Sequence, residues 1–153
     1  MPVQITPLCQ RDPQWSRIRI GKSAATVRDF GCTLTSCCMA LQKLRGTSVN
    51  PGEAAKFWSF KLKGEILWTM TKFLGMNFVW RGYIVDVAKV TKYANDPDKA
   101  VILEVNHRRH WIYLESVSKG IMTICDPIDG KRYVGLPKKY KFTGYALFEK
   151  AKK

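Results

Sequence analysis

The chain has 153 residues, 46% of them hydrophobic, and its 26 basic and 12 acidic side chains give a net charge of +14. This length favours a single domain over residues 1–153 that buries a hydrophobic core. No apolar run reaches the roughly 18 residues that a membrane span needs, and the first residues lack the basic and apolar regions of a secretory signal, so we expect a protein made in the cytoplasm without a membrane span.

A helix is predicted from Cys32 to Arg45, with Gly46 placed to end it. The apolar side chains that recur at steps of three and four residues are Leu34, Cys37, Cys38, Leu41 and Leu44. At the first residue of a helix, unpaired N–H groups and the helix dipole favour negative charge and lower the pKa of a thiol. Cys32 therefore occupies a position suited to a nucleophile, although a lone cysteine is more often a small buried apolar residue.

The middle of the chain, residues 50–95, is expected to provide scaffold and one wall of a cleft. Its patterns predict a helix that starts at Asn50–Glu53, helices over 64–74 and near 85–93, and a short strand at 78–80. Its tryptophans, Trp58, Trp68 and Trp80, are interpreted as core residues. Later strands are predicted near 100–105, 110–117, 121–126, 131–134 and 144–149.

Residues 110–126 are predicted to form a β-hairpin, because two runs rich in β-branched and aromatic residues flank a glycine-containing turn. Symmetric pairing places His110 opposite Asp126, where the carboxylate can accept from an imidazole N–H and fix its tautomer. A two-residue turn at 119–120 would instead place Asp126 opposite Tyr113. Both registers stay open at this point.

Four short motifs follow one another along the chain, and together they resemble a known family. They are Gln10 with Asp12-Pro13 and Trp15, Gly31-Cys32 with Thr35-Ser36 and Met39-Ala40, His110-Trp111, and Asp126-Pro127 with Gly130. In order and spacing they resemble the branch of the papain superfamily that is related to the bacteriocin double-glycine leader peptidases. The resemblance spans positions 10–130.

This resemblance implies a role for each of four residues. Cys32 would be the nucleophile, His110 the general base and Asp126 the group that orients the imidazole. Gln10 would donate to the oxyanion of the tetrahedral intermediate, beside the backbone N–H of Cys32. The chain departs from its relatives at Thr33-Leu34, where they often carry glycine or alanine followed by proline, and at Cys37-Cys38, where small or apolar residues are usual.

The expected fold is α+β and papain-like. An N-terminal helical half that carries Cys32 would pack on an antiparallel β-sheet that carries His110 and Asp126, with the active site in the cleft between them. In this arrangement Cys32 attacks a carbonyl carbon, His110 transfers the proton, and water releases the acyl-enzyme. The reaction needs no cofactor.

The five cysteines show no CxxC spacing, so a zinc site is not predicted, and reduced thiols suit a cytoplasmic protein. An inactivating disulfide between Cys9 and Cys32 stays open as an alternative. The second histidine, His107, is expected in a solvated loop, and we predict that only His110 serves as the base.

The favoured function is that of a cysteine peptidase or amidase acting on a peptide substrate. A second hypothesis is a phage-type lytic enzyme that cuts peptidoglycan with the same triad after release to the cell wall by lysis. A third is a non-enzymatic module that binds polyanions on a papain-like fold. The basic excess between Lys131 and Lys153 favours an anionic polymer as partner, while no nucleic-acid-binding motif is present.

Overall fold

The computed structural model describes residues 4–21, 24–46, 49–57, 75–83, 86–107 and 110–151. Its helices are α1 (Val27–Phe30), α2 (Cys32–Arg45), α3 (Pro51–Phe57) and α4 (Val87–Ala94). Its strands are β1 (Met76–Gly82), β2 (Lys99–Val105), β3 (His110–Ser118), β4 (Ile121–Asp126), β5 (Lys131–Val134) and β6 (Phe142–Lys150). None of the described helices is both long and apolar enough to cross a membrane.

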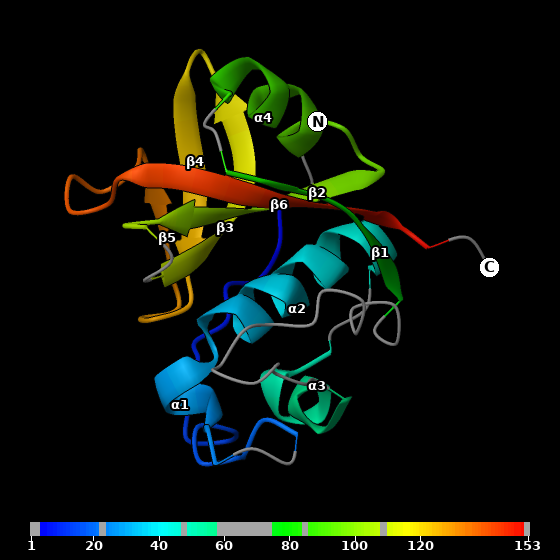
Figure 1. Cartoon of the computed structure of the whole chain (residues 1–153), viewed down its shortest axis with the longest axis vertical. Helices are drawn as coiled ribbons and strands as arrows, with labels where there is room; N and C mark the ends of the chain where they lie inside the picture. Colours follow the sequence, from blue (N-terminus) through cyan, green and yellow to red (C-terminus); the bar gives the residue numbers. More distant parts are fainter. Residues whose placement is uncertain are drawn as a thin grey trace.

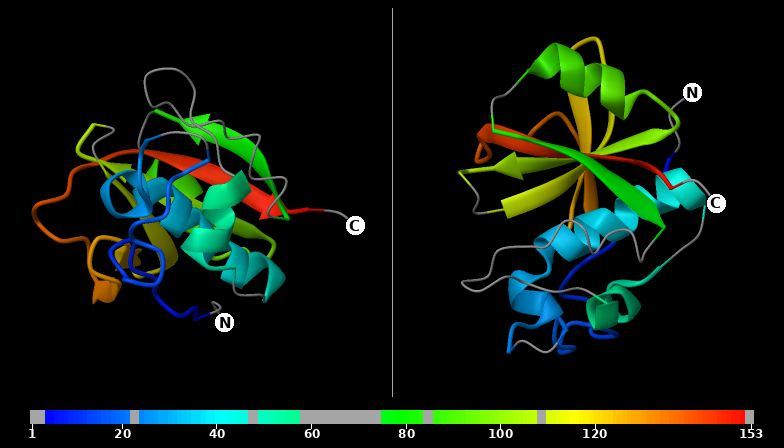
Figure 2. Two further views of the ribbon diagram at one scale, coloured as in Figure 1. Left: turned by 90° about the horizontal axis from the view of Figure 1, so that it is seen from below. Right: turned by 45° about the vertical axis from the view of Figure 1, so that its right-hand side comes forward.

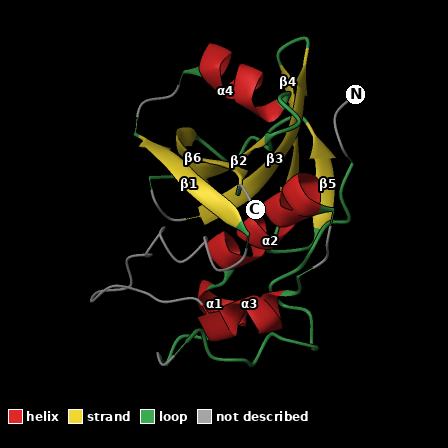
Figure 3. Cartoon of the chain, turned by 90° about the vertical axis from the view of Figure 1, so that its right-hand side faces the viewer, coloured by secondary structure: helices red, strands yellow, loops and turns green. Residues whose placement is uncertain are grey.

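The strands form one antiparallel sheet in the order β1-β6-β2-β3-β4-β5. Helix α2 runs along one face of this sheet and α4 covers the other, as Figures 1 and 2 show. Two buried clusters result, one between α2 and the sheet and one between α4 and the sheet. Helices α1 and α3 lie beyond α2, farther from the sheet (Figure 3). The predicted mixture of helices and an antiparallel sheet is confirmed.

Helix α2 has the predicted bounds, Cys32–Arg45, and its apolar side chains are buried. It ends at Gly46, whose φ of 65° lies in the left-handed region that glycine adopts without a Cβ penalty. The backbone N–H of Gly46 donates to the carbonyl of Gln42 at 3.0 Å. Local periodicity and one glycine therefore define this helix, and they place Cys32 in its first turn.

Most of the other predicted elements are present with small shifts of their ends. Helix α3 begins where the sequence predicted, because Asn50 Oδ1 accepts from the backbone N–H of Glu53 at 2.8 Å and so caps its first turn. The predicted helix over 64–74, together with Trp58 and Trp68, lies outside the described residues. The strand predicted at 78–80 is the centre of β1, which pairs with β6 and extends the sheet by an edge strand.

The interpretation of Trp80 as a core residue is wrong. Strand β1 is irregular between Phe78 and Trp80, and this irregularity changes which side chains face the core. Trp80 is 60% exposed, whereas Phe78 packs against the core cluster beneath the sheet. An edge strand with a bulge therefore turns one tryptophan to the surface.

The hairpin of β3 and β4 follows neither predicted register. Its turn does consist of Lys119 and Gly120, both with positive φ, but the pairing shifts between Leu114 and Ser116. As a result Tyr113 pairs with Cys125, and Asp126 is opposite neither His110 nor Tyr113.

The register shift between β3 and β4 leaves Glu115 without a partner on the opposite strand, and the contacts of its side chain explain the shift. The buried Glu115 carboxylate accepts from Arg132 Nε at 2.7 Å and from the backbone N–H of Ile5 at 3.1 Å. An ion pair satisfies this buried charge, which would be costly if it were left alone.

Candidate active site

Cys32 lies at a junction that only glycine allows. A Cβ added to Gly31 would stand 2.3 Å from the carbonyl oxygen of Val27, so α1 and α2 can meet this closely only because residue 31 has no side chain. The hydroxyl of Ser36, one turn along α2, donates to the backbone carbonyl of Trp111 at 3.3 Å. This bond ties the first turns of α2 to the start of β3, where His110 lies.

His110 and Asp126 are in direct contact despite the shifted register. Asp126 Oδ1 lies 2.7 Å from His110 Nε2, and it also accepts from the backbone N–H of Ile128 at 3.0 Å. Asp126 is buried, and His110 is half-buried. The contact therefore joins the first residue of β3 to the last residue of β4, and it leaves the other ring nitrogen, Nδ1, free of the carboxylate.

Cys32 and His110 shift the pKa of one another toward the charged forms. Burial on its own raises the pKa of the Cys32 thiol, but a hydrogen bond and a charge interaction with His110, helped by the Trp111 backbone and the Thr33 hydroxyl, lower it overall. Burial likewise disfavours the His110 cation, but its bonds with Asp126 and Cys32 raise its pKa to about 9. Near neutral pH this combination favours a thiolate beside an imidazolium.

Thr33, one of the positions where the chain departs from the family that it resembles in sequence, contacts the same thiol. Its hydroxyl oxygen lies 3.9 Å from Cys32 Sγ. This departure was expected to affect packing and substrate fit, whereas the contact also adds a polar group next to the sulfur.

Burial shifts the pKa of three other thiols in the opposite direction, toward the protonated form. Burial raises the pKa of Cys37 and of Cys38, and it raises that of Cys125 to about 12. All five cysteines are free, and Cys9 donates to the carbonyl of Ile128 at 3.7 Å. Among the thiols with a shifted pKa, Cys32 alone is shifted toward the thiolate.

Tyr140 also belongs to the candidate site, although no sequence pattern predicts it. Its hydroxyl donates to Asp126 Oδ2, and its ring lies against His110 with centroids 5.5 Å apart and planes at 38°. Burial raises the pKa of Asp126, but the bonds from His110, Tyr140 and Ile128 outweigh this and lower it. Tyr140 lies in the loop between β5 and β6, and its sequence neighbours are lysines, so no local pattern marks it.

Gln10 bridges the two halves of the site. Its backbone N–H donates to the carbonyl of Pro127 at 2.7 Å, and its side-chain Nε2 donates to the carbonyl of Arg28 at 2.8 Å. The residue is only 3% exposed. Because an amide nitrogen carries two hydrogens and the Arg28 bond uses one, Gln10 retains a second donor. Its predicted role at the oxyanion stays a prediction.

His107 lies apart from this arrangement, as expected. It is exposed, with a φ of 53°, in the turn that follows β2. Within the described ranges of the chain, no group of histidine, cysteine or acidic side chains could hold a metal ion.

Comparisons with known proteins support the fold. No family model matches this chain, and no curated protein sequence matches it. A solved structure with a similar fold is the crystal structure of a double glycine motif protease from an AMS/PCAT transporter in complex with the leader peptide. The TM-score is 0.57 at 18% sequence identity, and the match covers 97% of this chain and 100% of that one. At this identity the similarity establishes a related fold.

Proposed function

We propose that this chain is a papain-like cysteine peptidase or amidase that uses Cys32, His110 and Asp126 as a triad. The observation that carries the proposal is the contact of His110 Nε2 with Asp126 at 2.7 Å, on an imidazole that also lowers the pKa of the Cys32 thiol. A nucleophile, a base and a group that orients the base, linked in this order, are what thiol acyl transfer requires.

The proposed reaction starts from a Cys32 thiolate and a His110 imidazolium. The Cys32 thiolate attacks the carbonyl carbon of the scissile bond, and the His110 imidazolium gives its proton to the departing amine, which leaves a thioester on the enzyme. Water then attacks the thioester carbon while His110 accepts a proton, and the Cys32 thiolate departs. The second N–H of Gln10 and the backbone N–H of Cys32 would bind the oxyanion.

A peptide substrate is supported by the structural relative. The similar solved structure is a double glycine motif protease held in complex with a leader peptide. A related fold in which His110 contacts Asp126 and interacts with Cys32 favours the same class of bond here. A processing peptidase is therefore the first candidate.

A cell-wall lytic enzyme is the second candidate, and one observation favours it. The loop that carries Tyr140 also carries Lys138, Lys139 and Lys141, all of them exposed, so an excess of positive charge lies next to the Asp126 contact. Lys139 Nζ lies 5.1 Å from the centroid of the Tyr140 ring. Such a surface would attract an anionic polymer of the bacterial wall to the active site.

Cleavage assays with paired variants test the proposal. Purified protein is incubated with a digest of bacterial proteins and, in parallel, with peptidoglycan sacculi, and new termini are identified by mass spectrometry. We expect activity in the wild type and in His107→Ala, and a loss of several orders of magnitude in Cys32→Ala and His110→Ala, because triad members act as a unit. Activity that persists in folded Cys32→Ala would refute the proposal.

A further inference from the structure

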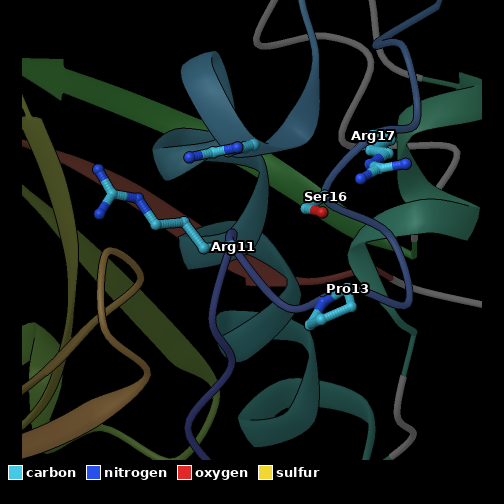
Figure 4. A pocket seen from close by; sticks show the side chains of 5 residues that line it. Arg11, Pro13, Ser16 and Arg17 are labelled. Atoms are coloured by element: carbon cyan, nitrogen blue, oxygen red, sulfur yellow. The ribbon is translucent and has the colours of Figure 1, made fainter.

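A pocket of about 480 Å³ is rich in arginine, and two of its residues, Arg11 and Arg28, are directly linked to Gln10. It is lined by Arg11, Pro13, Ser16, Arg17 and Arg28, and Figure 4 shows the turn that carries the first four of them. All three arginine side chains are exposed, and no ion pair among the described residues involves any of them. Three cations line this pocket, and none of its described lining residues is acidic, so the pocket attracts an anion.

Two residues that line this pocket are directly linked to Gln10, the candidate oxyanion donor. Arg11 directly follows Gln10, and the carbonyl of Arg28 accepts from Gln10 Nε2 at 2.8 Å. The backbone N–H of Arg28 in turn donates to the carbonyl of Ser16 at 3.0 Å, which joins the two sides of the pocket. Arg28 lies in α1, and Cys32 is the first residue of the next helix, α2. A substrate group in the pocket is thus held close to the reacting bond.

We infer that this pocket is a substrate subsite that binds the carboxylate of an aspartate or glutamate a few residues from the scissile bond, an inference that rests on the proposed peptidase function. Arginine suits this task better than lysine, because its planar guanidinium presents paired N–H donors that match the two carboxylate oxygens. Among the described residues no aromatic ring lines the pocket, and these residues therefore offer no stacking surface of the kind that a nucleic acid base would use.

Cleavage-site profiling tests the inference. The wild type and the variant Arg11→Gln/Arg17→Gln/Arg28→Gln are each given the same peptide digest, and the residues around every Cys32-dependent cleavage are counted. Matched peptides that carry glutamate or glutamine at the favoured position then give kcat/KM. The control variant Lys89→Gln/Lys92→Gln/Lys150→Gln loses the same charge from exposed positions on α4 and β6. Circular dichroism verifies that both variants are folded.

We expect an acidic preference at one position in the wild type and in the control, with kcat/KM about tenfold or more higher for glutamate than for glutamine, as hydrogen bonds to a charged group imply. The arginine variant should lose this preference while it still cleaves the glutamine peptide. Cys32-dependent cleavage with no acidic preference, or with a preference that survives in the arginine variant, would overturn the subsite and leave the peptidase intact. Absence of any Cys32-dependent cleavage would overturn both.

Discussion

At the scale of single residues, the site depends on a chain of contacts from Cys32 through His110 and Asp126 to Tyr140. Each member changes the protonation of the next, because Asp126 favours the His110 cation and His110 favours the Cys32 thiolate. Tyr140 is the outer end of this chain and contacts Asp126 through its hydroxyl. We regard it as a positioning residue that acts through the carboxylate.

Removing that hydroxyl gives a first prediction. Tyr140→Phe keeps the ring against His110 but deletes a hydrogen bond to a buried carboxylate, which is worth roughly 1.5–3 kcal/mol. We expect kcat/KM to fall about tenfold or more, because Asp126 then holds the imidazole less firmly, and the NMR shifts of the His110 ring to change. Tyr133→Phe is the control, since it deletes a tyrosine bond to Asp129 in the same part of the fold. An equal loss in both variants would contradict the role of Tyr140.

The sequence predicts some of these residues and misses others for a definite reason. Cys32 is recognisable because it follows a glycine and precedes a helical pattern, and His110 and Asp126 are recognisable because both lie on predicted strands. Tyr140 has no such context, because its contact with Asp126 exists only once the loop between β5 and β6 folds back. Contacts made by loops are not encoded in local periodicity.

At the scale of the elements, the junction between α1 and α2 sets the position of Cys32. Helix α1 has Thr26 at its N-terminus, and the backbone N–H of Gly31 donates to Val27 at 2.9 Å, so the chain turns directly from one helix into the next. The missing side chain at Gly31 allows this close passage.

Alanine substitutions at two glycines separate this effect from general destabilisation. Gly31→Ala places a methyl group 2.3 Å from a backbone oxygen, so we expect α2 to shift, stability to fall by about 1–3 kcal/mol and the reactivity of Cys32 to drop. Gly46→Ala meets no atom within 4 Å, but its φ of 65° costs roughly 1–2 kcal/mol. Thermal unfolding should show a loss in both variants, whereas Cys32 alkylation should slow only in Gly31→Ala. Unchanged reactivity in Gly31→Ala would contradict the importance of the junction.

The elements also show where prediction from sequence stops. The bounds of α2 and β5 agree with the sequence because periodicity and turn residues define them locally. The register of β3 against β4 was wrong because the bulge depends on Glu115 and Arg132, which are 17 positions apart. The helix α4 was predicted, but its place on the face opposite α2 is a property of the whole sheet.

At the scale of the whole molecule, the net charge is +14, and part of the excess of basic residues lies near the candidate active site. The loop that carries the three lysines contacts Asp126 through Tyr140, and the segments that carry the three arginines of the pocket adjoin or contact Gln10. A positive field at a reacting centre accelerates the approach of anionic substrates and is weakened by salt.

Salt dependence tests whether a wall polymer uses this field. If it does, initial rates on sacculi should fall steeply as salt screens charges beyond roughly 10 Å near 0.1 M, while rates on a short neutral peptide stay nearly constant. Charge reversal at Lys138, Lys139 and Lys141 should lower the sacculus rate at low salt and flatten its salt dependence. Cleavage of soluble peptides with no action on sacculi at any salt would exclude the wall polymer and leave a processing peptidase.

The central claim is that His110 maintains Cys32 as a thiolate, and alkylation as a function of pH tests it without a substrate. Iodoacetamide is applied across the mildly acidic to neutral range, and mass spectrometry gives the rate at each cysteine in the wild type, His107→Ala, His110→Ala and His110→Asn. Because the Cys32 pKa lies below its ordinary value of 9.0, the pH profile of its alkylation rate should be displaced toward lower pH, and at neutral pH it should be labelled faster than the other cysteines.

In both His110 variants the main interactions that offset burial are lost, so the pKa of Cys32 should rise and its alkylation rate at neutral pH should fall well below that of the wild type. The His107→Ala profile should match the wild type. A Cys32 profile that does not change in the folded His110 variants, or faster labelling of Cys9 or Cys125 than of Cys32 in the wild type, would contradict the claim.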